Sequence, residues 1–226
     1  INAVLRQSLR EADAMRATLE ALRETHPAIA HSHPDWLVRR WQAQWGKSDA
    51  IALLEWNNRP SDNYIRLNSL RPHSPEPEGE PVKFDWEKKS IRRLLSNTIP
   101  ATLPGFSGGA FYIQDPSTLL AVDMFNPRPG EAVLDLCAAP GGKTTAIAAC
   151  MKNDGRVVAT DIREDRLKQL RENCERLGAD CVEVMPLGTD VREKFDRVLV
   201  DVPCSNTGVM RRRVDLRWRL QPRDLQ

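Results

Sequence analysis

The sequence predicts an α/β fold in which a helical segment and a small α+β subdomain precede a doubly wound, parallel-sheet domain. Three observations support this prediction. Short β-branched apolar runs alternate with amphipathic helical stretches from about residue 130 onward. Apolar residues recur at helical spacing through residues 1–56. Between these regions, the proline-rich residues 72–81 predict an exposed loop or linker, because this composition cannot build a regular element.

The C-terminal half carries the alternation typical of βαβ units. The predicted strands cover residues 131–138, 156–162, 180–186 and 195–203, and the predicted helices cover residues 142–151 and 164–178. Only four strands are visible, so we expect an incomplete sheet. A helical pattern already running at residue 1, without an initiator methionine, likewise predicts a piece cut from a longer protein at both ends.

The sequence predicts three parts. Residues 1–56 form the helical segment, with breaks at its two His-Pro pairs. Residues 57–107 form the small α+β subdomain, with a strand near Tyr64 and a short helix from Asp85 to Leu95. Residues 108–226 form the α/β domain, whose first helix, residues 116–125, can be capped by Asp115.

Composition and charge narrow the class of protein. No apolar run approaches the roughly 18 residues that a membrane-spanning helix needs, so no membrane partner is expected. The five cysteines include no CxxC pair and no Cys/His cluster at zinc spacing, which predicts reduced thiols in a cytoplasmic protein without a metal site. The net charge is only +2, yet residues 205–226 hold six arginines and two aspartates, so that end is basic.

The stretch DLCAAPGGKTT, residues 135–145, superficially resembles a phosphate-binding loop. The Walker A pattern G-x-x-x-x-G-K-[ST] fails, because Cys137 stands where its first glycine must be. The dinucleotide pattern G-x-G-x-x-G fails as well, because the two glycines are adjacent. What remains is a tight turn between a strand and a helix, where small residues and a helix N-terminus can receive an anionic group such as a carboxylate.

A second feature decides the kind of ligand. Asp161 ends the next strand, 19 residues after Gly142, near the offset at which an acid binds ribose hydroxyls. A carboxylate at the turn and a ribose at Asp161 together describe S-adenosylmethionine better than a nucleoside triphosphate. The predicted cofactor-binding residues of the turn are Cys137, Ala138, Ala139, Pro140, Gly141, Gly142 and Lys143.

Three segments make a family resemblance specific. They are DLCAAPGGKTT, the longer stretch DPSTLLAVDMFNPRPGEAVLDLCAAPGGKT (residues 115–144) as a whole, and DVPCSNTGVMRRRVDLRW (residues 201–218). They resemble the motifs of the Sun/Fmu/NOP family of RNA cytosine-5 methyltransferases, particularly the bacterial enzymes for small-subunit ribosomal RNA. The resemblance covers nearly the whole chain. INAVLRQ is similar to the end of the family's NusB-like helical domain, and YIRLNSLR to its small subdomain before a Rossmann-like methyltransferase domain.

The resemblance implies roles for several residues. S-adenosylmethionine would bind at the turn and at Asp161, and Asp201 would lie where the methyl donor meets a flipped cytosine. Asp190 is the expected acid on the adenine side. In the family a thiolate adds to cytosine carbon 6, which makes carbon 5 nucleophilic enough to take the methyl group. The Pro-Cys cysteine, here Cys204, would assist product release.

The covalent nucleophile of the family lies in a Thr-Cys pair, which this sequence does not contain. We therefore expect the chain by itself to be inactive, either because it is truncated or because it is a degenerate relative. Ribosomal RNA is the expected partner, with Arg211, Arg212 and Arg213, and also Arg217 and Arg219, holding phosphates. Two alternatives stay open: a methyltransferase for a small molecule or protein, and a non-catalytic RNA-binding or assembly factor.

Overall fold

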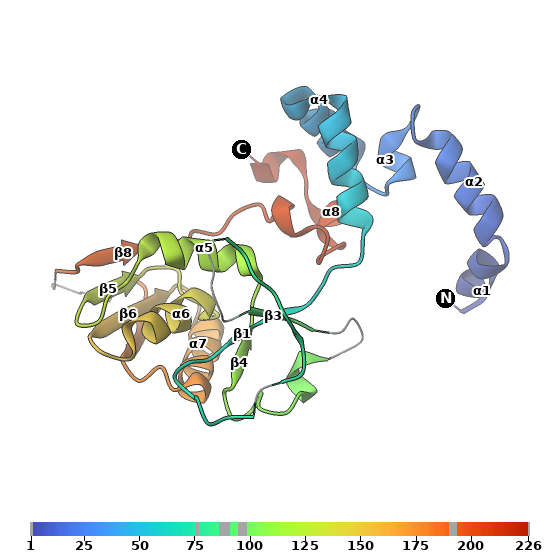
Figure 1. Ribbon diagram of the computed structural model, residues 1–226. Helices are drawn as coiled ribbons and strands as arrows, with labels where there is room; N and C mark the ends of the chain where they lie inside the picture. Colours follow the sequence, from blue (N-terminus) through green and yellow to red (C-terminus); the bar gives the residue numbers. More distant parts are fainter. Residues whose placement is uncertain (1, 76, 86–90, 95–98, 190–193, 226) are drawn as a thin grey trace. The chain divides into compact units, whose positions relative to one another are not determined.

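The computed structural model describes residues 2–75, 77–85, 91–94, 99–189 and 194–225 (Figure 1). The chain forms two compact units. The first contains residues 1–61 and 204–226, and the second contains residues 62–203. The boundaries expected from the sequence, after residues 56 and 107, remain predictions.

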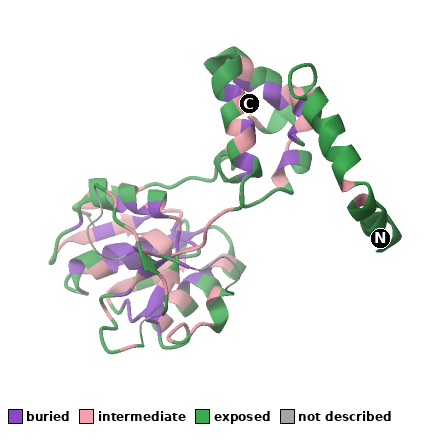
Figure 2. Cartoon of the chain, turned by 45° about the vertical axis from the view of Figure 1, so that its right-hand side comes forward, coloured by how far each residue is buried: buried purple, intermediate pink, exposed green. Residues whose placement is uncertain are grey.

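The first unit is helical. It contains α1 (Asn2–Arg10), α2 (Ala12–Leu22), α3 (Pro27–Ala30), α4 (Asp35–Asn58), α8 (Leu216–Arg219) and the 3-10 turns η2 (Thr207–Val209) and η3 (Pro222–Leu225). Its core joins α3 and α4 to the C-terminal segment through Leu37, Trp41, Leu54 and Met210. Figure 2 shows the contrast with α1 and α2, which have no buried residue. The predicted helical segment is thus confirmed.

The second unit begins with a small antiparallel sheet. Its strands are β1 (Tyr64–Leu67), β2 (Glu80–Pro81), β3 (Ile91–Arg93) and β4 (Phe111–Ile113), in the order β2-β3-β1-β4. The 3-10 turn η1 (Pro100–Thr102) precedes β4. The last two residues of the proline-rich stretch thus form an edge strand, where proline is tolerated because its missing N–H is not needed.

The helix expected from Asp85 to Leu95 is wrong for the part that the structure describes. Ile91–Arg93 form a strand that pairs with β1 on one side and β2 on the other. Ile91 is buried, with 2% of its surface exposed. Pairing on both edges and burial of Ile91 outweigh the local helical pattern, because strand formation depends on cross-strand neighbours. Residues 86–90 and 95 lie outside the described part.

The rest of the second unit is the predicted α/β domain. It contains α5 (Pro116–Phe125), β5 (Ala132–Asp135), α6 (Gly142–Met151), β6 (Arg156–Asp161), α7 (Glu164–Leu177), β7 (Val182–Pro186) and β8 (Arg197–Leu199). The four strands form a parallel sheet in the order β7-β6-β5-β8. The Asp115 carboxylate accepts the Ser117 N–H and caps α5, as predicted. The predicted fold class is confirmed.

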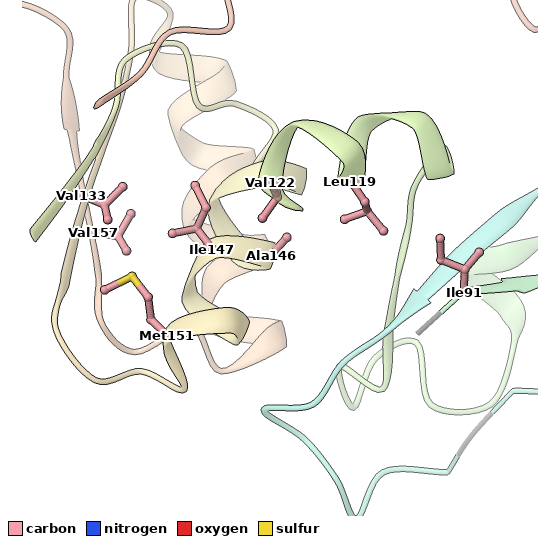
Figure 3. Packing of buried hydrophobic residues seen from close by; sticks show 8 residues of the cluster. All are labelled: Ile91, Leu119, Val122, Val133, Ala146, Ile147, Met151 and Val157. Atoms are coloured by element: carbon pink, nitrogen blue, oxygen red, sulfur yellow. The ribbon is translucent and has the colours of Figure 1, made fainter. Parts of the chain in front are cut away.

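One core connects the two sheets of this unit (Figure 3). Val133 and Val157, from β5 and β6, pack against Ile147 and Met151 of α6. The remaining members, from α5, α6 and β3, are Leu119, Val122, Ala146 and Ile91. Because α5 and α6 pack between the parallel sheet and β3, the antiparallel sheet is held beside the turn that begins α6.

Candidate functional site

The turn after β5 is the first part of the site. The Ala138 N–H donates to the Thr160 carbonyl at 2.8 Å, which ties the turn to β6. Gly141 has φ +103°, and a Cβ there would lie 2.7 Å from Leu170 Cδ1, so this position favours glycine. α6 begins at the next residue, and among the described side chains none caps it. Its first N–H groups can therefore receive a ligand anion.

Asp161 lies beside this turn, at the end of β6. It is buried, and its Oδ2 accepts the Ala139 N–H at 3.2 Å while its Oδ1 accepts the Arg163 N–H at 3.3 Å. Arg166 completes the contact: its guanidinium lies 3.7 Å from Asp161 Oδ2 and donates to the Ala139 carbonyl. The parallel pairing of β5 and β6 thus brings together the two features on which the sequence prediction of a cofactor depends.

A hollow of about 220 Å³ lies beside the turn. The turn and two neighbouring acids contribute Asp135, Cys137, Ala138, Ala139, Pro140, Gly142, Lys143 and Asp201 to its wall. Its volume is below the roughly 300–1,000 Å³ usual for small-molecule sites, so it would enclose one part of a ligand. Gly141 and Asp161, two of the predicted cofactor-binding residues, do not line this hollow, although Asp161 contacts the turn through the Ala139 N–H.

The opposite wall comes from residues that the sequence prediction missed. β4, the two residues that follow it and the start of α5 contribute Tyr112, Ile113, Gln114, Asp115 and Thr118. A Cβ on Gly142 would lie 3.0 Å from Tyr112 Cε1 and 3.5 Å from Gln114 Nε2, so this wall closely approaches the first residue of α6. The sequence predicts Asp115 only as a helix cap, and no sequence signal places any of these residues at the turn, because they reach it through packing of the antiparallel sheet and α5.

Asp135 is a further residue that the site prediction missed. It is 1% exposed, and its Oδ2 accepts a hydrogen bond from the Thr144 hydroxyl at 2.8 Å. Its Oδ1 has no hydrogen-bond partner in the described structure. Burial raises the pKa of Asp135 to about 6, although the Thr144 bond and the Lys143 charge oppose this shift. A buried carboxylate with one free oxygen on the wall of a hollow suits a ligand cation such as an ammonium group. Its position as the last residue of an apolar strand was the available signal.

Lys143 and Asp201 form an ion pair on the same wall. Lys143 Nζ lies 2.6 Å from Asp201 Oδ2, and the Asp201 side chain is 54% exposed while that of Lys143 is 20% exposed. The pair connects the first turn of α6 to the segment after β8. The structure thus brings Asp201, predicted from its motif alone, to the cofactor turn.

The cysteines differ in their surroundings. Partial burial, and then the charges of Asp161, Asp135 and Asp201, raise the pKa of the Cys137 thiol, which therefore stays protonated at neutral pH. Cys204 lies in the first compact unit, is exposed, and its Sγ accepts the Asn206 N–H at 3.4 Å. Asp190, the expected adenine-side acid, lies outside the described residues.

The arginines expected to hold phosphates differ in burial and in the groups that they contact. Arg217 is 3% exposed and donates to the Asn57 carbonyl and to Asn58 Oδ1, both at 2.6 Å, so its predicted phosphate contact is wrong. Its guanidinium instead forms hydrogen bonds within the first unit. Arg211 stacks on Trp56, with its guanidinium carbon 4.1 Å from the ring centre. Arg212 and Arg213 are exposed.

The described residues offer neither a metal-ligand cluster nor a membrane-spanning helix. Across the ranges that the structure describes, no three His, Cys, Asp or Glu side chains are grouped so that they could hold a metal ion. Among the helices described, none combines the length and apolarity needed to cross a bilayer.

The parallel sheet, the turn before α6 and the acid after β6 define an α/β domain of the S-adenosylmethionine-dependent methyltransferase class. Residues 122–226 match the family described as 16S rRNA methyltransferase RsmB/F, and residues 33–76 match the ferredoxin-like domain of RsmF/B-like methyltransferases. The chain belongs to this family of RNA methyltransferases.

Individual proteins similar to this chain carry names from the same family. The probable ribosomal RNA small subunit methyltransferase B of Bacillus subtilis is 35% identical over 241 residues, covering 99% of this chain and 52% of the relative. Ribosomal RNA small subunit methyltransferase B of Serratia proteamaculans is also 35% identical, covering 100% of this chain and 53% of the relative. The chain therefore spans about half the length of these relatives. A methyltransferase homologue from Pyrococcus horikoshii superposes with a TM-score of 0.65 at 28% identity, covering 83% of this chain and 65% of that one.

Proposed function

We propose that the second unit binds S-adenosylmethionine and that the protein methylates carbon 5 of a cytosine in small-subunit ribosomal RNA. The contact between the turn and Asp161 is the observation that carries this proposal. It places a buried carboxylate, suited to ribose hydroxyls, next to an uncapped helix N-terminus, suited to a carboxylate. The family membership and the names of the relatives support RNA as the substrate.

Different residues in and beside the hollow would bind different parts of S-adenosylmethionine. The uncapped start of α6 would receive the amino-acid carboxylate, and the free Oδ1 of Asp135 would accept from the ammonium group. Asp161, which lies at the end of β6 outside the lining of this hollow, would bind the ribose. When bound, S-adenosylmethionine supplies an electrophilic methyl group next to this wall.

The target cytosine would bind at the outer side of the wall that contains Lys143 and Asp201. Asp201 would hydrogen-bond the flipped cytosine, and Lys143 would hold the Asp201 carboxylate in place. A cysteine thiolate adds to carbon 6, the electron pair of carbon 5 takes the methyl group, and a base then removes the carbon 5 proton as the thiolate leaves. Cys204 would assist that release. The protonated Cys137 is not suited to the nucleophile's role.

RNA phosphates would contact the predicted arginines other than the buried Arg217. Arg211 donates to the carbonyls of Arg59 and Pro60, and with its stacking on Trp56 this fixes the guanidinium in place. A guanidinium has five N–H donors, so some remain for a phosphate. Arg212 and Arg213 would add charge beside it. A cytoplasmic location fits this substrate and remains a proposal.

Calorimetric titration with S-adenosylmethionine, and separately with ATP, tests the cofactor assignment. We expect binding of S-adenosylmethionine only. Asp161→Ala should weaken it by roughly 10- to 100-fold, because a buried hydrogen bond to a charged group contributes about 1.5–3 kcal/mol. Asp180→Ala, at an exposed acid of the same unit, is the matched control and should leave the affinity unchanged. Binding of ATP, or equal effects of the two substitutions, would refute the assignment.

Methyl transfer is tested separately with labelled S-adenosylmethionine and ribosomal RNA. The expectation that these 226 residues alone do not complete the transfer remains a prediction, since the Thr-Cys pair is not in their sequence. Labelled 5-methylcytosine formed by this chain would contradict it. Transfer to a protein or a small molecule instead would favour the alternative substrate classes.

A further inference from the structure

Arg66, in the middle of β1, is a buried cation without an acidic partner. It is 5% exposed, and its Nε donates to Gln114 Oε1 while its Nη2 donates to the Thr145 hydroxyl, both at 2.9 Å. Among the described residues no carboxylate lies within ion-pair distance of it. Burial lowers the pKa of Arg66 to about 10, so the side chain remains charged at neutral pH. Such a charge is costly to bury, because neutral amide and hydroxyl groups replace water only in part.

Both hydrogen-bond partners of Arg66 lead to the hollow described above. The Thr145 hydroxyl donates onward to the Gly141 carbonyl at 2.7 Å, which holds the turn before α6. Gln114 lines the hollow, and its Nε2 donates to the Thr118 hydroxyl at 2.9 Å. Arg66 therefore supports the turn on one side of the hollow and the Gln114 amide on the other.

The contact with Arg66 fixes which way the Gln114 amide faces. Since guanidinium groups only donate, the oxygen of Gln114 must point at Arg66 and the NH₂ group must point away from it. That nitrogen has two hydrogens and one acceptor, Thr118, among the described residues. It lies 3.5 Å from where a Cβ on Gly142 would be, directly beside the uncapped start of α6. The Gln114 amide nitrogen and the first N–H groups of α6 thus lie close together.

Donors that lie close together, one of them on an amide hydrogen-bonded to a buried cation, favour an anion. The hollow also contains the Asp135 carboxylate, with its free Oδ1, on the wall formed by β5. A site with donors on one side and an acid on the other suits a ligand that carries a carboxylate and an ammonium group together. An amino-acid moiety has this chemistry.

We propose that Arg66 is a positioning residue that makes this site selective for ligands carrying a carboxylate. It acts through Gln114 and Thr145, by orienting the donors and by adding positive potential behind them. The inference rests on the proposed function, because it assigns the amino-acid end of the cofactor to this hollow.

Two ligands that differ only in the amino-acid part test this inference. S-adenosylhomocysteine carries the carboxylate and the ammonium group, whereas 5′-methylthioadenosine retains the adenosine and lacks both. We expect Arg66→Met, which removes the charge but keeps much of the volume, to weaken S-adenosylhomocysteine at least tenfold in calorimetric titration. Its effect on 5′-methylthioadenosine should be within about twofold. Arg66→Lys should fall between Arg66→Met and the unchanged protein.

A second variant keeps the test valid if Arg66→Met does not fold. Gln114→Glu is nearly isosteric and places a carboxylate against Arg66, so it neutralises the cation without emptying the core. We expect the same selective loss for S-adenosylhomocysteine, with a melting temperature that is unchanged or higher. Arg92→Met, at a half-buried position of β3 that pairs with Ile65 of β1, is the control and should leave both affinities unchanged.

The outcomes separate this inference from the proposed function. Equal weakening of both ligands by Gln114→Glu, or no weakening of either, would overturn the role of Arg66 while the cofactor assignment stands. Failure of the unchanged protein to bind either ligand would overturn the cofactor assignment and this inference with it. A selective loss of S-adenosylhomocysteine supports both.

Discussion

Two buried arginines, one in each compact unit, have different surroundings. Arg217 of the first unit donates to the Asn57 carbonyl and to Asn58 Oδ1, so it joins the C-terminal segment to the end of α4. Arg66 of the second unit donates to two side chains that themselves face a hollow or a turn. Burial lowers the pKa of both. Burial of an arginine therefore does not by itself reveal its role. The role depends on whether the groups that it hydrogen-bonds still have N–H donors that a ligand can use.

The largest expected effect tests the structural side of this comparison. Arg217→Met should lower the free energy of unfolding of the first unit by about 3 kcal/mol, because it leaves buried carbonyl acceptors unpaired. Urea unfolding followed by tryptophan fluorescence is suitable, since the described unit contains Trp36, Trp41 and Trp56. Affinity for S-adenosylhomocysteine should not change.

The neighbouring Arg219 provides the control for that measurement. It is exposed and pairs with Asp215 at 3.3 Å, so Arg219→Met should change stability by less than about 0.5 kcal/mol. Similar losses of stability from both substitutions would mean that the buried contacts of Arg217 contribute little. The structural role assigned to Arg217, in contrast to Arg66, would then be wrong.

A pH dependence tests the acid that faces the Arg66 side of the hollow. The folded-state pKa of Asp135 is raised from 3.8 to about 6, so the protonated form stabilises the fold. This contribution is complete below about pH 4 and is lost as pH rises through 6. The difference between the two pKa values corresponds to about 3 kcal/mol at most.

Asp135→Asn isolates that contribution, because the amide oxygen introduced by the substitution can still accept from Thr144 while the side chain no longer titrates. The free energy of unfolding of the unchanged protein should fall relative to the variant as pH rises from 4 to 7, as measured by urea unfolding with circular dichroism. A difference between the two proteins that stays constant over this range would show that Asp135 is not desolvated.

A smaller effect tests the turn that Arg66 supports through Thr145. Gly141→Ala forces a Cβ to within 2.7 Å of Leu170 at φ +103° and should cost about 2–3 kcal/mol. Gly130→Ala has φ +83° with no atom within 4 Å of the new Cβ and should cost about 1–2 kcal/mol. The difference between their thermal unfolding curves measures the clash alone. Equal costs would mean that the turn can move away from α7.

The smallest effect concerns the run of arginines at residues 211–213 of the first unit. Arg211→Ala should weaken binding of single-stranded RNA a few-fold and reduce the salt slope by about 1, as loss of one phosphate contact does. Arg10→Ala, on exposed α1, is the matched control and should leave the slope unchanged. Filter binding at several salt concentrations measures both. An unchanged slope for Arg211→Ala would assign Arg211 the same purely structural role as Arg217.

The sequence by itself determined the parallel sheet, the helices that alternate with its strands and the pairing of the turn with Asp161. These features follow from local periodicity and from motifs in which all the informative residues are close together, so short-range physics is sufficient. The same reasoning was wrong for Ile91–Arg93, because two strands distant in the sequence supply the hydrogen bonds that make it β3.

Only the tertiary structure distinguished the arginines and found the second wall of the hollow. In the sequence, Arg211 and Arg217 lie in one basic run, but packing buries one among backbone carbonyls and stacks the other on Trp56. Arg66 and Gln114 are 48 residues apart and meet the turn only after the antiparallel sheet packs against α5 and α6. Burial and long-range hydrogen bonding decide the role of such polar groups, and neither can be read from spacing along the chain.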